Sequence, residues 1–192
     1  MTWLVVGLGN PGPSYAATRH NVGYLVTDVL AARMGSAFKA HTSRRADVVE
    51  GRLAGERAVL GRSRSYMNDS GGAVSTLAKY YDVRPEQLIV VQDELDLPFG
   101  SLRVKFGGGD NGHNGLRDIR RALGTGDYFR VRIGIGRPAK TGNRGGGVTD
   151  HVLKTFSRSD RKDLPGYIQE AADAVESLIT RGLEATQSSF NR

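Results

Sequence analysis

The chain has no cysteine among its 192 residues. That absence excludes disulfide bonds, thiolate metal sites and cysteine nucleophiles together, and it weakly favours a reducing compartment. Long apolar runs are lacking too. The apolar run at residues 3–8 has only the length of a strand, no basic region precedes it, and no segment approaches the ~20 apolar residues of a membrane span. We therefore expect a cytoplasmic protein without a membrane segment.

Acidic residues are fewer than basic ones, 20 against 27, which gives a formal net charge of +7. A field of this sign attracts polyanions, and nucleic acid is the commonest such partner, although a basic surface also keeps a protein soluble. The acids concentrate at residues 93–96 and near the C-terminus. The basic residues gather in the second half of the chain, at Arg117, Arg120, Arg121, Arg130, Arg132, Arg137, Lys140 and Arg144. A positive region beside an acid-bearing centre suits a substrate that contains phosphates.

The length and the hydrophobic content of 39% suffice for one sizeable core, so we expect a single globular domain over residues 1–192. Strand and helix signals alternate along the chain, which predicts an α/β fold: a twisted mixed β-sheet with helices packed around it. Helices are expected at 19–34, 69–81 (with Asn68 or Asp69 as N-cap), 114–123 and 160–181, and a mobile glycine-rich loop at 138–149. Strands are expected at 3–8, 46–53, 57–62 (after a turn at Gly55-Glu56), 88–93, 101–106 and 129–135.

Residues 3–24 carry most of the clues to function, because an apolar run there ends abruptly in glycines, prolines, an asparagine and a histidine. The glycines match the dinucleotide fingerprint G-x-G-x-x-G. That fingerprint needs a helix opening within the glycines and, ~20 residues on, an acidic residue that ends a second strand. Pro11 and Pro13 disfavour the helix, and Asp28, at about that distance, falls inside the later helix. The sequence therefore predicts no nucleotide cofactor.

Polar side chains follow predicted strands at the edge where open α/β sheets bind ligands. Asn10 follows the first strand, Asp93 ends the central one, and the glycine-rich run 107–115 follows the strand that contains Lys105. His20, at the start of a helix, is placed to face this cleft as a general base, and Asp93 is the obvious carboxylate to orient it. Position alone equally allows both residues to be caps of a helix and a turn.

Asparagines gather in the same segments, at Asn10, Asn21, Asn68, Asn111 and Asn114. Asparagine is routine in turns and caps, but several amides beside one histidine and one buried aspartate form an uncharged donor set for a carbonyl, a water or an oxyanion. No serine stands in G-x-S-x-G, so water is the expected nucleophile. This set favours hydrolysis over redox chemistry.

Other groups are weaker candidates. The acids at 93–96 suit magnesium, but Pro98 and Gly100 indicate a turn, and no metal site is predicted. The glycines at 107–109 lack the G-K-[ST] ending of a P-loop, which favours a flexible gate or a close backbone contact. His113 is the second histidine candidate, whereas His41 and His151 have no polar constellation around them that suggests a site, and they are expected at the surface. A catalytically silent RNA-binding protein remains an alternative to an enzyme.

Four motifs occur in order between Leu4 and Gly136: GLGNPGxxYxxTRHNxG, YMNxSG, DELDLPxG and GGGxxGHNGLRD. As a set they closely resemble the bacterial peptidyl-tRNA hydrolase family, with weaker similarity in the C-terminal helices. The resemblance implies a monomeric enzyme without cofactor or metal. It would hydrolyse the ester between a peptide's C-terminal carbonyl and the 3′-terminal ribose of tRNA, and release free tRNA for reuse in translation.

The resemblance also implies roles for single residues. His20 would act as general base on water, Asp93 would orient it, and Asn10 would distinguish N-blocked peptidyl-tRNA from free aminoacyl-tRNA. Lys105 and Arg132 would clamp tRNA phosphate, and we expect recognition of the backbone and the shared 3′ end rather than of base sequence. The side chains expected to line the site or hold the substrate are Tyr15, Asn21, Tyr66, Met67, Asn68, His113 and Asn114.

Overall fold

The computed structural model describes residues 1–138 and 147–191. Seven strands form one mixed sheet in the order β2-β3-β4-β1-β5-β7-β6. The central strands β4, β1, β5 and β7 run parallel, and antiparallel pairs flank them. The bounds are Trp3–Gly7 for β1, Lys39–Ala40 for β2, Ala46–Leu53 for β3, Glu56–Ser63 for β4, Leu88–Glu94 for β5, Leu102–Phe106 for β6 and Phe129–Gly134 for β7. The predicted α/β fold with a mixed sheet is confirmed.

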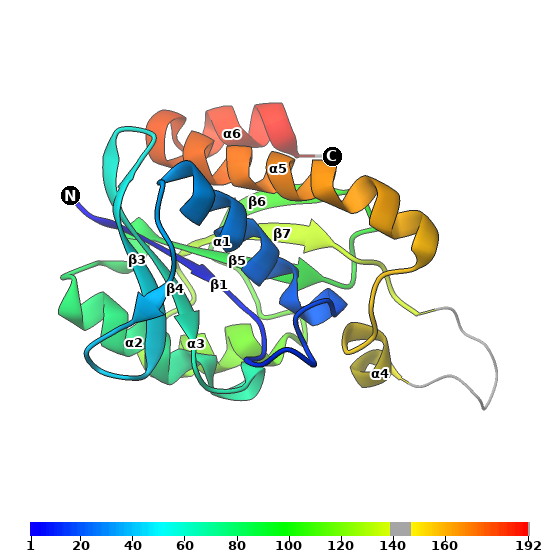
Figure 1. The fold of residues 1–192 in the computed structure, drawn as a ribbon. Coiled ribbons are helices and arrows are strands. Elements are labelled where there is room, and N and C mark those ends of the chain that lie inside the picture. The colour runs from blue at the N-terminus through cyan, green and yellow to red at the C-terminus, as the bar shows by residue number, and fades with distance from the viewer. Residues whose placement is uncertain (139–146, 192) are drawn as a thin grey trace.

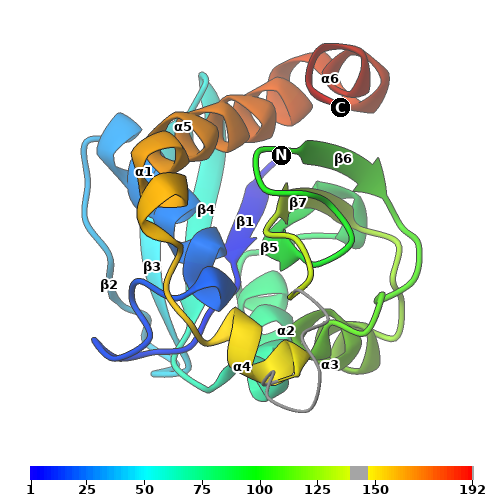
Figure 2. The same cartoon turned by 90° about the vertical axis from the view of Figure 1, so that its right-hand side faces the viewer.

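Helices cover both faces of this sheet (Figures 1 and 2). On one face lie α1 (Val22–Arg33) and α5 (Arg158–Arg181), and on the other lie α2 (Ser70–Tyr80) and α3 (Asn114–Leu123). The short α4 (Val148–Val152) stands near the end of the sheet, and α6 (Leu183–Phe190) follows the edge strand β6. Every residue of β5 is buried, as expected for a parallel strand with helices above and below it.

Each face has its own core. Val26 of α1 and Val175 of α5 belong to one cluster with Val5 and Val91, and Leu77 of α2 and Ile119 of α3 belong to the other. The alternation of side chains along the central strands divides their apolar residues between the two clusters. This double packing fixes the strand ends from which the polar residues project.

The predicted elements lie within a few residues of those observed, with several corrections. The hairpin turns at Ala54-Gly55, since Leu53 pairs with Glu56. A 3-10 turn precedes α1 and another precedes α2. Asp69, one of the two predicted candidates, stands at the N-cap position of α2, but its side chain makes no capping hydrogen bond. The elements β2, α4 and α6 were not predicted. The expected loop 138–149 ends earlier than expected, at the start of α4, and its residues 139–146 lie outside the described residues.

His41 also differs from the expectation. It is buried with 4% of its surface exposed, and its ring packs edge-on against Tyr80 at a centroid distance of 4.4 Å. The prediction that His41 is a surface residue is therefore wrong, because Tyr80 at the end of α2 and Tyr81 after it pack against its ring. Within residues 1–138 and 147–191, no helix is long and apolar enough to cross a bilayer.

Candidate active site

The carboxyl ends of the four parallel strands meet at one edge of the sheet. Asn10 follows β1, residues 66–68 follow β4, and Asp93 is the penultimate residue of β5. His20 reaches the same edge from the 3-10 turn at the start of α1. Ligands of open α/β sheets bind at such an edge, and these residues do line one cavity there.

The glycine-rich run after β6 reaches this edge only at its far end. Because β6 is antiparallel to β7, its carboxyl end points to the opposite edge, contrary to the expectation for the whole run 107–115. Gly107 instead donates its N–H to the Tyr128 carbonyl (2.9 Å), and the chain then returns toward the cavity, which residues 111–114 line.

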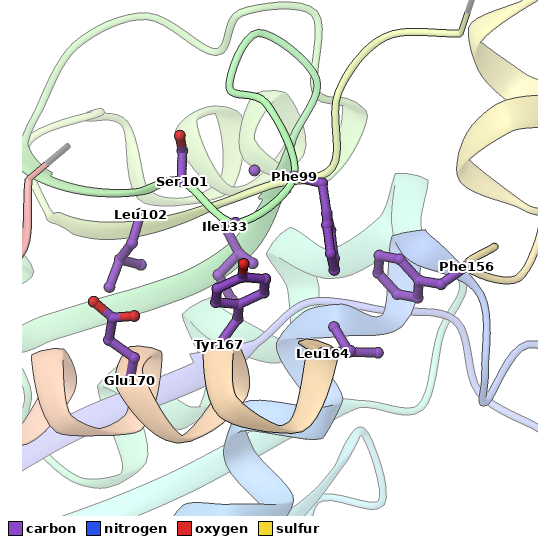
Figure 3. A pocket seen from close by; sticks show the side chains of 10 residues that line it. Phe99, Ser101, Leu102, Ile133, Phe156, Leu164, Tyr167 and Glu170 are labelled. Carbon is purple, nitrogen blue, oxygen red and sulfur yellow. The ribbon is translucent and has the colours of Figure 1, made fainter. Parts of the chain in front are cut away.

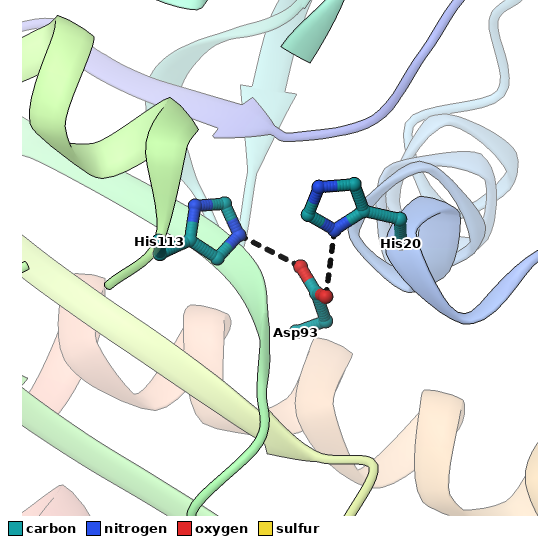
Figure 4. A group of neighbouring side chains, drawn as sticks. All are labelled: His20, Asp93 and His113. Atoms are coloured by element: carbon teal, nitrogen blue, oxygen red, sulfur yellow. Dashed lines mark hydrogen bonds and ion pairs between the residues drawn. The ribbon is translucent and has the colours of Figure 1, made fainter. Parts of the chain in front are cut away.

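One carboxylate binds two imidazoles at the centre of the site (Figure 4). Asp93 Oδ2 lies 2.7 Å from His20 Nδ1, and Asp93 Oδ1 lies 2.8 Å from His113 Nε2. Asp93 is 2% exposed, whereas His20 and His113 are half-buried and line the cavity. Burial by itself would raise the pKa of Asp93, but the two facing histidines together hold that pKa well below its ordinary range.

The hydrogen bonds of His113 show which ring nitrogens of His113 and His20 carry protons. Its Nδ1 accepts the backbone N–H groups of Gly115 (3.1 Å) and Leu116 (3.3 Å) at the start of α3. A nitrogen that accepts carries no proton, so the neutral ring holds its proton on Nε2 and donates it to Asp93. Asp93 also accepts from His20 Nδ1, which leaves His20 Nε2 without a proton. Thus the helix-cap interpretation considered for His20 applies instead to His113.

Asn10 is held in one orientation by its neighbours. Its backbone N–H donates to Asn21 Oδ1 (2.8 Å), and its carbonyl accepts from Asn21 Nδ2 (2.9 Å). The Asn10 side-chain oxygen accepts the Met67 backbone N–H at 2.7 Å. Since that oxygen is engaged, the amide NH₂ of Asn10 is the group left for a ligand. Asn21 is fully buried behind Asn10 and does not line the cavity.

The cavity has a volume of about 330 Å³. Tyr15 and Tyr66 pack edge-to-face at its border, with ring centroids 6.0 Å apart, and Tyr66 is largely exposed. Among the predicted site residues, the structure brings together around this cavity Asn10, Tyr15, His20, Tyr66, Met67, Asn68, Asp93, His113 and Asn114.

Part of the cavity wall was missed in the sequence. One side of the cavity is closed by α4 and the residue after it, through Val148, Thr149, Val152 and Leu153. Leu95, the residue after β5, lies in the same wall. Val148 and Val152 stand four residues apart, which is the spacing of one helix face. That spacing was the available signal, but the preceding glycine-rich stretch led to the prediction of a loop.

The predicted phosphate-binding residues lie outside the cavity. Arg132 pairs with Glu94 through Nε (3.0 Å) and Nη2 (2.9 Å). Lys105 is half-buried on the edge strand β6, and burial, followed by the nearby Arg132 and Arg130, lowers its pKa.

Arg130 is not the surface charge that its place in the basic cluster suggested. It is fully buried, and its guanidinium lies 4.6 Å from the Tyr128 ring centroid. Its nitrogens donate to the backbone carbonyls of Gly108 and Gly126, each at 2.9 Å, and to that of Gly109. Arg130 therefore fixes the glycine-rich run that leads to His113.

The acids considered for magnesium are engaged with nitrogen donors. Asn111 Nδ2 donates to both Glu94 and Asp96, and Arg137 Nε lies 2.6 Å from Asp96. A different group, His20, Asp93 and His113, offers three ligand atoms that lie within 4.8 Å of one another. Two imidazoles and a carboxylate form a donor set that zinc accepts.

A second enclosed space lies between the sheet and α5 (Figure 3). Phe99, Phe156 and Tyr167 are among its walls, and its volume is about 10 Å³. A space of this size holds at most one water molecule. It is therefore no alternative substrate site.

Comparison with known proteins points to one family. The family model described as peptidyl-tRNA hydrolase matches residues 4–192. Peptidyl-tRNA hydrolase of Frankia alni is 57% identical over 189 residues, 98% of this chain and 93% of the relative. That of Mycolicibacterium smegmatis is 54% identical over 188 residues, 98% of this chain and 96% of the relative.

Solved structures agree as well. The crystal structure of peptidyl-tRNA hydrolase from Acinetobacter baumannii has a TM-score of 0.90 to this chain at 36% sequence identity. The match covers 99% of this chain and 94% of that one. Sequence and structure thus match over nearly the full length, and the chain belongs to the peptidyl-tRNA hydrolase family.

Proposed function

We propose that the chain hydrolyses the ester between the C-terminal carbonyl of a peptide and the 3′-terminal ribose of tRNA. The observation that carries this proposal is the His20–Asp93–His113 group at the border of a cavity that asparagine amides also line. A base, its orienting carboxylate and uncharged donors are the groups that attack of water on an ester requires.

In the proposed first step, His20 Nε2 takes a proton from a water molecule whose oxygen attacks the ester carbonyl carbon. Nδ1 of the same ring remains bonded to Asp93, which stabilises the imidazolium that forms. His113 acts through Asp93: by donating to Oδ1 and capping α3, it holds the carboxylate against His20. Such a base typically contributes ~10²- to 10⁴-fold in rate.

The tetrahedral intermediate carries an oxyanion, which needs hydrogen-bond donors. The Asn10 amide offers its NH₂ because Met67 occupies its oxygen. Asn68 and Asn114 line the same cavity and add further amides for the oxyanion, the water or the peptide backbone. Collapse of the intermediate breaks the bond to the ribose oxygen, which takes the proton back from His20. The products are a peptide with a free carboxylate and tRNA.

The tRNA is proposed to enter past the aromatic border of the cavity. Tyr66 and Tyr15 provide faces on which the terminal nucleoside can stack. Lys105 then contacts a backbone phosphate, and Arg132 assists through Nη1, the nitrogen that does not bond to Glu94. These contacts carry no base sequence information, which suits an enzyme that serves many tRNAs.

We propose that the reaction needs no metal ion. The His20–Asp93–His113 group could supply zinc ligands only if His113 Nε2 gave up the proton that it donates to Asp93. The two backbone N–H groups at His113 Nδ1 keep the proton on Nε2. The hydrogen-bonded arrangement is therefore favoured over a metal-bound one.

The direct assay compares release of tRNA from N-acetyl-aminoacyl-tRNA and from the same aminoacyl-tRNA without the acetyl group. We expect the wild type to cleave the first and to spare the second. Asn10→Ala should lower kcat by about 10²- to 10³-fold, the usual cost of losing one oxyanion donor. Asn21→Ala is the comparison variant and should lose less, because the Asn21 side chain bonds to the Asn10 backbone and does not line the cavity.

Failure of the wild type to cleave N-acetyl-aminoacyl-tRNA would contradict the proposed function. Equal cleavage of both substrates would contradict the selectivity alone. A full-rate Asn10→Ala enzyme would remove Asn10 from the mechanism.

A further inference from the structure

A second hollow, of about 540 Å³, lies behind the segment that lines the active-site cavity. Tyr66, Met67 and Asn68 line the cavity, whereas their neighbours Ser65 and Asp69 line this hollow. Four arginines surround it: Arg44, Arg45, Arg64 and Arg121. None of the roles proposed above uses this hollow.

The arginines are presented by a fixed turn. Arg44 has a φ of 60°, a left-handed conformation that residues other than glycine adopt at a cost. Its N–H donates to the His41 carbonyl (2.9 Å), and the His41 side chain is buried beside α2. Arg64 N–H donates to the Arg45 carbonyl (2.9 Å), which ties this turn to the end of β4.

The charges in the hollow are only partly neutralised. Arg64 pairs with Asp47 (2.8 Å) and Arg121 with Asp118 (2.5 Å). Within the part of the chain that the structure describes, Arg44 and Arg45 form no ion pair, and both are exposed. Two neighbouring positive charges without an ion pair favour the arrival of an anion.

The carboxylates near these arginines do not close the hollow to an anion. Asp118 is buried, and its Oδ2 accepts the Gly71 N–H at the start of α2 (2.8 Å), so its charge is already engaged. Asp69 also lines the hollow and offsets one of its four arginines. On the α2 side, a Cβ at Gly72 would lie 3.3 Å from Arg45 Nη1, so the glycine leaves room for the guanidinium.

The helix α3 connects this hollow with the region of Lys105. Arg120 Nη2 donates to the Gly108 carbonyl (2.7 Å), where Lys105 also lies, and Arg121 on the same helix borders the hollow. Arg117, Arg120 and Arg121 are all exposed. Basic side chains thus extend from the edge of the sheet across α3 to the hollow.

We propose that the arginine hollow binds phosphate groups of the tRNA backbone, as a second anchoring point for the substrate across α3 from Lys105. This inference rests on the proposed function and extends its substrate contacts. Guanidinium groups bind phosphate oxygens through paired N–H donors. An acidic peptide is the competing ligand, but of the residues that line the hollow only Ala73 has an apolar side chain to hold one.

The test uses Arg44→Gln/Arg45→Gln, which removes the two unpaired charges. The matched control is Arg52→Gln/Arg57→Gln. These two arginines are also exposed and pair with each other near the turn of the β3–β4 hairpin, and their replacement changes the net charge by the same amount. Each enzyme is assayed on N-acetyl-aminoacyl-tRNA and on the same ester of the trinucleotide CCA, over a range of salt concentrations.

For the Arg44/Arg45 variant we expect KM on the full tRNA to rise about tenfold at low salt, since two charge-to-phosphate contacts are lost. The slope of log KM against log salt should fall by about 1 to 2, at ~0.9 per contact. Turnover of the CCA ester should stay unchanged, which also verifies the fold, and Arg44→Lys/Arg45→Lys should keep most of the affinity.

Unchanged KM and salt slope on the full tRNA would overturn the inference, as would an equal effect of the control pair. Equal losses on both substrates would do so too, because they would mark the arginines as parts of the fold. If the rise in KM depended on acidic residues in the peptide and not on the length of the RNA, the hollow would bind the peptide instead of the tRNA. Inactive wild type would instead contradict the proposed function itself.

Discussion

Replacement of His20 by alanine is expected to lower kcat for N-acetyl-aminoacyl-tRNA by about 10³-fold or more, with little change in substrate affinity. His20 is the ring whose second nitrogen is left without a proton by the bond between Nδ1 and Asp93 (2.7 Å). Without it, water must attack the ester unassisted, while the asparagines and the basic surface still hold the substrate. Single-turnover kinetics and filter binding of tRNA separate the two effects.

Added imidazole provides the control for this variant. The alanine leaves space beside the cavity, and free imidazole should restore part of the rate because it replaces the missing base. The wild type should show no such gain. Near-normal hydrolysis by His20→Ala would contradict the mechanism and favour the alternative in which the basic surface serves RNA binding alone.

The replacement Asp93→Asn should lower kcat by about 10⁴-fold, the order of loss expected when the orienting group of a catalytic histidine no longer accepts its proton. Asp93 accepts from His20 on one oxygen and from His113 on the other. An asparagine has one oxygen, so its NH₂ must face one of the two rings. If that NH₂ faced His20, it could donate only to an unprotonated Nδ1. The ring would then carry its proton on Nε2, the nitrogen that has to act as the base.

The control for this variant is Asp96→Asn, three residues further along the chain. Asp96 is exposed and bonds to Arg137 and Asn111 rather than to a histidine, so its loss should change kcat only slightly. Imidazole should not rescue Asp93→Asn, since the catalytic ring is still present. Equal activity of Asp93→Asn and the wild type would remove the carboxylate from the mechanism.

Asp93→Asn also tests the electrostatics of the buried Asp93 carboxylate. Because the two histidines hold the pKa of Asp93 below its ordinary value of ~3.9, the ionised group stabilises the fold above that pH. This contribution disappears as the pH falls through the lowered native pKa. Urea unfolding should therefore show Asp93→Asn less stable than the wild type at neutral pH, with a difference that shrinks in strong acid.

The sequence predicted most of the sheet and the centre of the site because both depend on local patterns. The apolar run 88–91 predicted a buried strand, and the residues that follow strands marked Asn10 and Asp93. Periodicity placed His20 at the start of a helix, and its contact with Asp93 is the one proposed there. These features follow from residue spacing and from the rule that parallel strands end at one edge.

Other features depend on tertiary contacts that no local pattern encodes. Arg130 and Arg132 stand two residues apart in a basic stretch, yet one is fully buried against glycine carbonyls and the other pairs with Glu94. The local sequence around His41 does not indicate burial, but Tyr80 at the end of α2 and Tyr81 after it pack against its ring. The direction of β6 could not be derived either, so the start of the glycine-rich run was placed at the wrong edge, and only residues 111–114 reach the cavity as expected.

The proposed reaction depends on one event: a water molecule, activated without a metal, attacks the acyl carbon of the ester. Turnover of N-acetyl-aminoacyl-tRNA by the wild type in ¹⁸O-labelled water containing EDTA, followed by mass spectrometry of both products, tests it most directly. We predict an undiminished rate, one ¹⁸O atom in the carboxylate of the released N-acetyl-amino acid and none in the tRNA. Label in the terminal ribose of the tRNA, or loss of turnover in EDTA, would contradict this mechanism.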